Sequence, residues 1–218
     1  AYIEPYTPKD VEAAERLDAL INRMYLEPSL GKGYPTDKFE YLKKIEKFIK
    51  QDDYKKLQFD FDFIGLQYYF RVVVQNCWYV PYINAKEVKP AKRNVHTNEM
   101  NCEVFPNGLF RLIKKLDEYE KVKKIIITEN GVCYKDVLDN GKVNDVERIQ
   151  FFENHLKQVQ NAIEEGIKVD GYFVWSLTDN FEWDKGFRPR FGLTYIDFQN
   201  NLRRIMKASG YWFKDFLK

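Results

Sequence analysis

The sequence predicts an α/β protein whose strands form part of a (β/α)8 barrel. Apolar runs at residues 58–70, 124–128 and 170–183 alternate with amphipathic segments, as in the βα units that build a parallel sheet. The middle run, "IIIT", lacks the apolar and polar alternation of a half-exposed strand, which indicates burial on both faces. Each unit takes about sixty residues, and a complete barrel typically needs about 250, so eight such units cannot fit into 218 residues. We therefore expect an incomplete barrel and a single domain over residues 1–218.

Two helices are expected before the first strand. The segment "TPKDVEAAERLDALINRMYL" begins with Thr7 as a helix N-cap and Pro8 at the first helical position. The segment at 36–51, "TDKFEYLKKIEKFIKQ", places apolar side chains on one helical face and lysines on the other. The strand at 58–70 follows, and "RVVVQNCWYVPYIN" continues it as extended chain or as a loop.

The middle of the chain repeats the helix and strand alternation. A helix is expected over residues 107–119, and the buried strand follows at 124–128. The strand leads directly into Glu129, an ionisable acid, and then into Asn130 and Gly131. An Asn-Gly pair favours a tight turn with positive φ, so we expect the chain to turn there.

The last two helices complete the pattern. A long helix over residues 145–165 has Asn144 and Glu147 in the positions of a capping box, and Gly166 marks its end. After the third strand, "RRIMKASGYWFKDFL" at 203–217 is expected to close the chain as one helix.

Composition excludes several classes of partner and cofactor. The 35 basic residues are interleaved with 33 acidic residues, which argues against binding of nucleic acid. Cys77, Cys102 and Cys133 are far apart and have no CxxC spacing, so reduced thiols are expected rather than a zinc site, and nothing in the sequence calls for a metal or other cofactor. No apolar run approaches about 18 residues and no leader precedes the first helix, so we expect no membrane contact and a cytoplasmic location.

The aromatic content, 17% of the chain, has two interpretations. Dense packing of aromatic rings in the core is one. The other is a sugar site, because aromatic rings with polar groups match the C–H faces and hydroxyls of sugars.

Polar and aromatic side chains follow all three strands at the point where each strand ends. They are Gln67 and Tyr69 after the first, Glu129 after the second, and Trp175, Glu182 and Trp183 after the third. One such end could simply begin a solvated turn. Because the carboxyl ends of parallel strands meet at one edge, the three together predict a pocket that binds hydroxyls, stacks a ring and presents a carboxylate.

Four motifs carry a resemblance to a known family. In this order and spacing, "DFIGLQYY", "IIITENGV", "DVERIQFFENHL" and "GYFVWSLTDNFEW" followed by "FGLTYIDF" resemble the C-terminal half of the family 1 glycoside hydrolases, the β-glucosidase family. The resemblance covers essentially the whole chain. It implies the C-terminal portion of a (β/α)8 TIM barrel, about three to four βα units, and a retaining β-glycosidase that hydrolyses β-linked glucosides.

The resemblance also implies the roles of the catalytic residues. Glu129 matches the nucleophile that forms a covalent glycosyl-enzyme, and Tyr69 matches the tyrosine that orients it by a hydrogen bond. Retaining chemistry needs a second carboxyl about 5 to 5.5 Å away, as acid and then base. In the family this carboxyl lies in a "NEP" motif on an earlier strand, and the sequence has no such motif.

The other matched positions are implied to bind the sugar. Trp175 matches the ring beneath the sugar, Glu182 and Trp183 match the partners of its distal hydroxyls, and Gln67 and Phe191 complete the set. Gln67 departs from the usual asparagine of the family, and its extra methylene would shift the amide relative to the sugar or the neighbouring acid. The family also tends to carry a cis peptide at the step that corresponds to Trp175-Ser176.

The resemblance leaves the substrate and the partners open. Lys185 and Arg188 lie where phospho-sugar members would need a basic residue, although ordinary β-glucosidases are similar there, so unphosphorylated substrates are favoured. Without the acid/base residue, the 218-residue chain is expected to be inactive or nearly so by itself. The expected partner is the missing N-terminal half of the barrel or a second copy of the chain. The alternative is a non-catalytic sugar-binding or assembly fragment of a split or truncated barrel.

Overall fold

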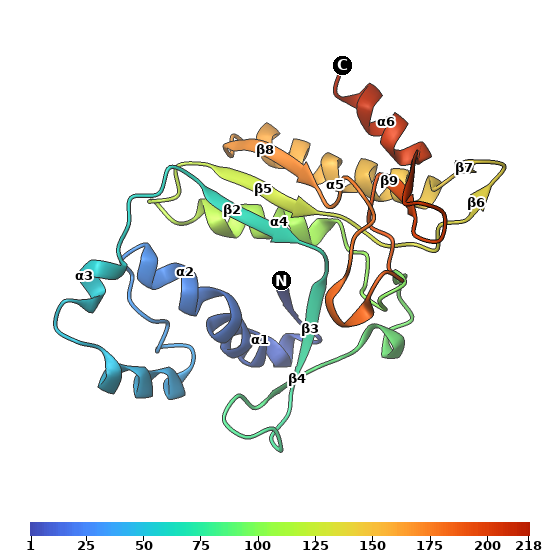
Figure 1. The fold of residues 1–218 in the computed structure, drawn as a ribbon. Coiled ribbons are helices and arrows are strands. Elements are labelled where there is room, and N and C mark those ends of the chain that lie inside the picture. Colours follow the sequence, from blue (N-terminus) through green and yellow to red (C-terminus); the bar gives the residue numbers. More distant parts are fainter.

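The computed structural model describes all 218 residues, with ten strands and six α-helices (Figure 1). The strands are β1 (Tyr2–Pro5), β2 (Ile64–Tyr68), β3 (Arg71–Asn76), β4 (Ala85–Glu87), β5 (Ile125–Asn130), β6 (Leu138–Asp139), β7 (Lys142–Val143), β8 (Val169–Val174), β9 (Thr194–Asp197) and β10 (Arg203–Met206). The α-helices are α1 (Val11–Asp18), α2 (Met24–Ser29), α3 (Asp53–Leu57), α4 (Asn107–Asp117), α5 (Val146–Glu164) and α6 (Ala208–Phe216).

The central sheet has the order β2-β5-β8, and all of its strands are parallel, as predicted. Helices α4 and α5 cover one face of it (Figure 1). The core between them includes Ile125 and Ile127 of β5, Ile113 of α4 and Ala162 of α5, all fully buried. The apolar character of both strand and helix faces thus fixes which side of the sheet the helices cover.

A fourth parallel strand lies beside the continuation of β2. After Tyr69 and Phe70 the chain runs on as β3, and β1 pairs with β3 in parallel register, Tyr2 opposite Arg71. Strand β4 adds to β3 as an antiparallel hairpin. At the other end of the arc, β8 pairs only with β5, so its far edge is unpaired within the sheet.

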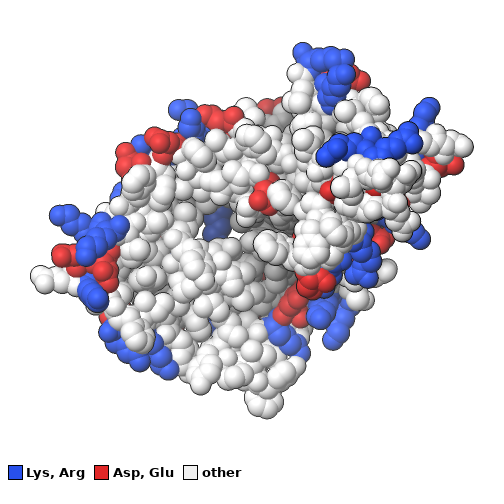
Figure 2. Space-filling model, in the orientation of Figure 1, with Lys and Arg blue, Asp and Glu red and all other residues white.

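The face of the sheet opposite the helices is shaped by two glycines. A Cβ on Gly65 would lie 3.2 Å from Thr128, and one on Gly171 would lie 3.2 Å from Ile126. Side chains from β5 therefore fit over the backbone of both neighbouring strands. In the orientation of Figure 1, the strands lie in front of α4 and α5, and Figure 2 shows few charged side chains over the centre of this face, with most charges around its rim.

The first helix begins as predicted but does not run straight. Thr7 is the N-cap of a 3-10 turn, Pro8–Asp10, in which the Asp10 carboxylate accepts hydrogen bonds from the Thr7 hydroxyl at 2.6 Å and the Thr7 amide at 3.0 Å. A π-helical turn, Ala19–Arg23, then separates α1 from α2.

The second predicted helix is a 3-10 helix, Glu40–Phe48, rather than an α-helix. Its core contacts, Phe39, Leu42 and Ile45, are spaced by three residues. A spacing of three places side chains one above the other in a 3-10 helix, whereas an α-helix would rotate them apart.

The start of the closing helix was predicted wrongly. Residues Arg203–Met206 form β10, which pairs with β9, and only Ala208–Phe216 is helical. Ile205 is buried between two exposed neighbours, which suits a strand, but the partner strand is needed to recognise such a short one.

The capping box predicted for α5 is also wrong, although the end of the helix is confirmed. The N-cap is Asp145, not Asn144, and the Asp145 side chain pairs with Arg148 and Ser209 instead of capping the helix. Gly166 follows the helix with φ of 89°, as its predicted stop requires. None of the helices is long and apolar enough to cross a membrane.

Candidate active site

The residues predicted from the three strand ends gather at one pocket. A cavity of about 330 Å³ lies at the carboxyl ends of the central strands, at the small end of the range for ligand pockets. It is lined by Tyr69, Phe70, Asn98, Met100, Cys102, Glu129, Trp175, Glu182, Trp183 and Phe191. Six of the seven predicted site residues are in this set, and the seventh, Gln67, contacts Glu129 directly.

Glu129 is held by two donors from the neighbouring strand end. Gln67 Nε2 donates to Glu129 Oε1 at 2.7 Å, and the Tyr69 hydroxyl donates to Oε2 at 2.6 Å. The register of β2 and β5 places Gln67 directly opposite Glu129. Both carboxylate oxygens are thus engaged, which fixes the direction of the carboxylate.

Tyr69 is suited to act as a donor. Burial raises the pKa of its hydroxyl well above the usual range, and the hydrogen bond to Glu129 and the charge of that carboxylate raise it further. The ring of Tyr69 packs edge-on against Phe191, with centroids 6.2 Å apart. The phenol therefore stays protonated and its ring is fixed by packing.

The tip of β5 does not form the predicted positive-φ turn. Neither Asn130 nor Gly131 has positive φ. Gly131 is required for another reason, because a Cβ there would lie 1.7 Å from the carbonyl oxygen of Trp175. The glycine allows the backbone of β5 to pass directly beside the backbone that follows β8.

Asn130 ties the three central strands together at the level of the pocket. Its Nδ2 donates to the carbonyl of Tyr68 on β2 at 2.6 Å, and its Oδ1 accepts from the Tyr172 hydroxyl on β8 at 2.5 Å. Its backbone carbonyl accepts from the amide of Trp175 at 2.8 Å. Asn130 is fully buried, so these bonds satisfy a side chain that has no access to water.

The segment after β8 supplies the rest of the pocket. The Trp175-Ser176 peptide is cis, which confirms the expectation drawn from the resemblance. Glu182 lies at the mouth of the pocket, where burial raises its pKa and the charges of Glu129 and Asp184 add to that rise against a hydrogen bond from Asn180. Trp183 beside it is 82% exposed, so its ring face is open to a ligand.

Four pocket residues were not singled out from the sequence, and one of them, Phe70, directly follows Tyr69. Asn98, Met100 and Cys102 come from the loop before α4 and form one wall of the pocket. The Asn98 carbonyl oxygen Oδ1 accepts from the amides of Met100 and Cys102 at 2.9 and 3.0 Å, which gives this loop a fixed shape. Only their position ahead of α4 marks them in the sequence, because they belong to no strand end.

The cysteines and other possible metal ligands form no second centre. All three cysteines are free thiols, and burial raises the pKa of Cys133 to about 12, so that thiol stays protonated. No group of three His, Cys, Asp or Glu side chains is arranged to hold a metal ion.

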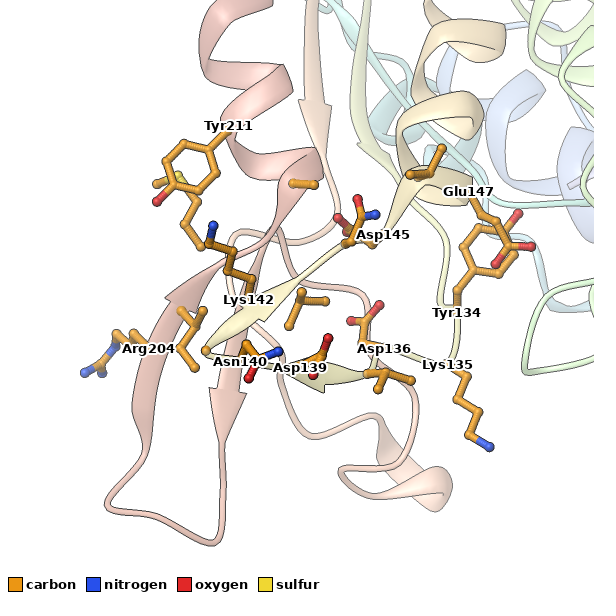
Figure 3. Close-up of a pocket in the computed structure, with 18 of the residues that line it drawn as sticks. Tyr134, Lys135, Asp136, Asp139, Asn140, Lys142, Asp145, Glu147, Arg204 and Tyr211 are labelled. Atoms are coloured by element: carbon orange, nitrogen blue, oxygen red, sulfur yellow. The ribbon is translucent and has the colours of Figure 1, made fainter.

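A larger cavity lies elsewhere in the molecule. It measures about 1240 Å³ and lies between the hairpins β6-β7 and β9-β10, near the start of α6 (Figure 3). None of the predicted site residues lines it. The candidate active site is therefore located by the residues at the strand ends and not by the volume of a cavity.

Comparisons with known proteins show which family the chain resembles. The model of the family described as glycosyl hydrolase family 1 matches residues 2–218. A 1,4-beta-D-glucan glucohydrolase of Thermotoga neapolitana is 36% identical over all of this chain, which covers 49% of the relative. A 6-phospho-beta-galactosidase of Leptotrichia buccalis is 31% identical over 97% of this chain and 50% of its own length.

A solved structure shows the same fold. The beta-glucosidase of Thermotoga maritima in complex with castanospermine superposes with a TM-score of 0.88 at 34% identity, over 100% of this chain and 48% of that one. The chain thus spans about half the length of the relatives that it matches, and its fold is part of a TIM barrel.

Proposed function

The chain belongs to glycosyl hydrolase family 1, and from this premise we propose that it carries the nucleophile and part of the sugar site of a retaining β-glycosidase that acts on β-linked glucosides. The observation that carries the proposal is the carboxylate of Glu129, which both Gln67 and Tyr69 hydrogen-bond at the end of a buried parallel strand. Such a carboxylate is fixed in direction by two donors and lines a pocket, which are properties that a nucleophile needs.

In the proposed reaction, Glu129 attacks the anomeric carbon of the glucoside and the bond to the leaving oxygen breaks. Tyr69 and Gln67 direct the carboxylate oxygens toward that carbon, and the protonated phenol of Tyr69 remains a donor throughout because burial raises its pKa. A second carboxyl group must protonate the leaving oxygen and later activate water. We assign that group to the part of the barrel that this chain does not include.

The sugar is proposed to lie between the aromatic and acidic side chains of the segment after β8. Trp175 and Trp183 offer ring faces, and the carboxylate of Glu182 can bind two neighbouring hydroxyls. Gln67 and Phe191 complete the site beside Glu129. A carboxylate bound to hydroxyls disfavours a sugar that lacks them, because its oxygens would then lose their partners.

We propose an unphosphorylated sugar. Lys185, the basic residue nearest in sequence to Glu182, donates to Asp184 at 2.5 Å, so a carboxylate already balances its charge. A phosphate group at this end of the pocket would also face the acid of Glu182. The similarity to a 6-phospho-beta-galactosidase covers the fold, while these contacts favour a neutral glucoside.

We propose four βα units for the chain, beginning at β1, β2, β5 and β8. Such an arc requires a partner for its open face, which would be the N-terminal half of the barrel or a second copy of the chain. The partner would also bring the second carboxyl group. The 218-residue chain alone is therefore expected to hydrolyse unactivated glucosides at a rate at least about 10²- to 10⁴-fold lower than that of the complete enzyme.

The test is covalent labelling with a 2-deoxy-2-fluoro glucoside that has a good leaving group, which needs a nucleophile but little acid assistance. We expect one added sugar by intact mass, located on the peptide with Glu129, and none in a Glu129→Gln variant. Cellobiose should not be turned over by the chain alone. A folded protein that takes no label would contradict the proposal and leave a sugar-binding or assembly role.

A further inference from the structure

A buried network of charges joins the two loops that form the pocket. The first is the β5-β6 loop, residues 131–137, which follows Glu129 directly. The second is the β8-β9 loop, residues 175–193, which carries Trp175, Glu182, Trp183 and Phe191. The network contains three carboxylates and three cations, which are Asp136, Asp145, Asp179, Arg148, Arg190 and Lys207.

Lys207 is the member that connects the two loops directly. Its ammonium group donates to Asp136 Oδ2 in the β5-β6 loop, and to Asp179 Oδ1 in the β8-β9 loop at 2.8 Å. The side chains of Lys207 and Asp179 are 0% exposed, and that of Asp136 is 1% exposed. The Lys207 amide also donates to the carbonyl of Leu193 at 2.9 Å, so both backbone and side chain bind the second loop.

Asp179 in turn binds the backbone at the end of its own loop and in β9. Its Oδ1 accepts from the amide of Gly192 at 2.9 Å, and its Oδ2 accepts from the amide of Ile196 at 3.2 Å and from Arg190 Nη1 at 2.9 Å. The two ends of the β8-β9 loop are thereby closed on one carboxylate. Glu182 and Trp183 lie on the arc between them.

Arg148 of α5 supports the first loop in the same way. Its guanidinium donates to Asp136, to the carbonyl of Val132 at 3.3 Å and to the carbonyl of Arg190 at 2.6 Å. Asp136 and Asp145 form part of the wall of the large cavity in Figure 3, so the network borders that cavity.

The energetics favour a role in positioning over one in stability. A buried ion pair pays for the removal of its charges from water, so it adds little net stability, while the loss of one partner leaves an uncompensated charge. Burial and the neighbouring Arg148 both lower the pKa of Lys207, which shows how costly the charged lysine is at this place. An apolar side chain at this position would avoid the desolvation of the lysine, but it would take one cation away from the buried carboxylates of Asp136 and Asp179.

We propose that Lys207 is a positioning residue that fixes the β8-β9 loop against the β5-β6 loop and so sets the place of Glu182 and Trp183 relative to Glu129. The effect on sugar binding rests on the proposed function, whereas the connection between the loops does not. The hydrogen bonds of Lys207 reach no residue that lines the pocket, so it acts through Asp136 and Asp179.

The connection is tested by hydrogen exchange in Lys207→Met, which removes the charge and keeps much of the side-chain volume. We expect the amides of Gly192 and Ile196 to exchange at least about 10-fold faster, while amides of α4 keep their wild-type rates. Lys115→Met is the matched control, because Lys115 also joins distant elements through Asp18 but lies away from the pocket. It should leave the exchange of the Gly192 and Ile196 amides unchanged.

Two results would overturn the proposal. One is unchanged exchange of Gly192 and Ile196 in a folded Lys207→Met protein. The other is faster exchange to the same extent in α4, which would make Lys207 a residue of general stability. If Lys207→Met does not fold, Asp136→Asn takes its place, because it weakens the pairing with Lys207 and leaves the Asp179 acceptors of Gly192 and Ile196 in place.

The consequence for sugar binding is tested by labelling with the 2-deoxy-2-fluoro glucoside over a range of concentrations. In Lys207→Met we expect the half-saturating concentration to rise by up to about 10²-fold, with a smaller change in the maximal rate. In a double variant that carries both Lys207→Met and Glu182→Gln, the two increases in half-saturating concentration, taken as free energies, should not add, because both changes act through the same loop. Full additivity of the two losses would contradict the proposal. A wild-type protein that takes no label would refute the proposed glycosidase function, and the hydrogen-exchange result would still decide whether Lys207 connects the two loops.

Discussion

Glu129 and His155 show how the environment of a single side chain determines its chemistry. Glu129 lies at the end of an apolar strand, yet both its oxygens have donors. His155, on the buried face of α5, is the opposite case: its Nδ1 bonds the carbonyl of Phe151 at 2.8 Å, while its Nε2 has no partner. The ring is 0% exposed and stacks on Phe151 with centroids 3.9 Å apart. Burial lowers the pKa of His155 to about 4, so it is neutral in the folded protein.

His155 should make the fold sensitive to acid. Below the pKa of about 6.5 that a histidine has in an unfolded chain, the unfolded state binds a proton that the folded state does not bind until about pH 4. Stability should therefore fall as pH drops from 6.5 to 4, by about 3 kcal/mol from this group, and be level above 6.5. Urea unfolding at pH 7 and pH 4 measures this. His155→Leu should show a correspondingly smaller acid loss, and His96→Gln should behave like wild type; equal losses in His155→Leu and wild type would count against it.

At the scale of elements, the pocket depends on how closely β5 and β8 approach. Asn130 links β5 to both neighbours, and Gly131 lets the Trp175 carbonyl lie where any other residue would have its Cβ. Asn130 and Gly131 thus hold the three central strands close together at the level of the Glu129 carboxylate. They do so without the turn that the dipeptide favours in hairpins.

Gly131→Ala should therefore disturb both stability and the pocket. The added methyl group must push apart two backbones, which typically costs about 1 to 3 kcal/mol, and we expect the upper end because backbone cannot yield as a side chain does. Chemical unfolding measures the cost, and labelling of Glu129 should slow as well. Gly141→Ala is the control: its φ of 75° strains alanine by about 1 to 2 kcal/mol, but no atom lies within 4 Å and labelling should not change. A Gly131→Ala protein as stable as wild type would show that the approach is not a constraint.

Most elements of the sheet and its cover could be predicted from sequence, because their patterns are long and repeated. The strand expected at 124–128 is Ile125–Asn130, and the helix expected at 145–165 is Val146–Glu164. The strand at Arg203–Met206 was missed because four residues carry too short a pattern to distinguish a strand from a helix start without the partner strand.

The site divides in the same way. Residues at strand ends could be predicted because parallel topology brings strand ends together, and the structure does bring all of them to one pocket or into contact with it. Their roles in catalysis stay a prediction. The supporting charges could not be predicted, because Arg148 sits among apolar positions of α5 and Lys207 before α6, and only the folded chain shows which carboxylates they meet.

At the scale of the whole molecule, the arc of strands leaves an apolar surface without cover. Phe173 on β8 is 60% exposed, and Leu177 just beyond it is 72% exposed. The edge of β8 is unpaired in the sheet, and the face in Figure 2 has few charges near its centre. Surfaces of this kind associate with other strands or apolar faces.

The 218-residue chain alone should therefore bind a hydrophobic dye and associate at micromolar concentration, as measured by sedimentation. Phe173→Lys should reduce both while changing the free energy of unfolding by no more than about 0.5 kcal/mol, since the side chain is already exposed. Phe48→Lys is the matched control, because Phe48 is 73% exposed on the 3-10 helix, away from the sheet, and should leave association unchanged. A compact monomer that binds no dye would show that the uncovered face of the sheet does not drive association.

The position of Lys207 in the chain also orders events during synthesis. Asp136, Asp145, Arg148 and Asp179 all leave the ribosome before the lysine that joins them. A nascent chain that ends before residue 207 can build β2, β5 and β8 with the helices between them, because those contacts are already complete. The loop that bears Glu182 and Trp183 then lacks its bond to Lys207, so a polypeptide stalled before residue 207 should offer that loop to proteases more readily.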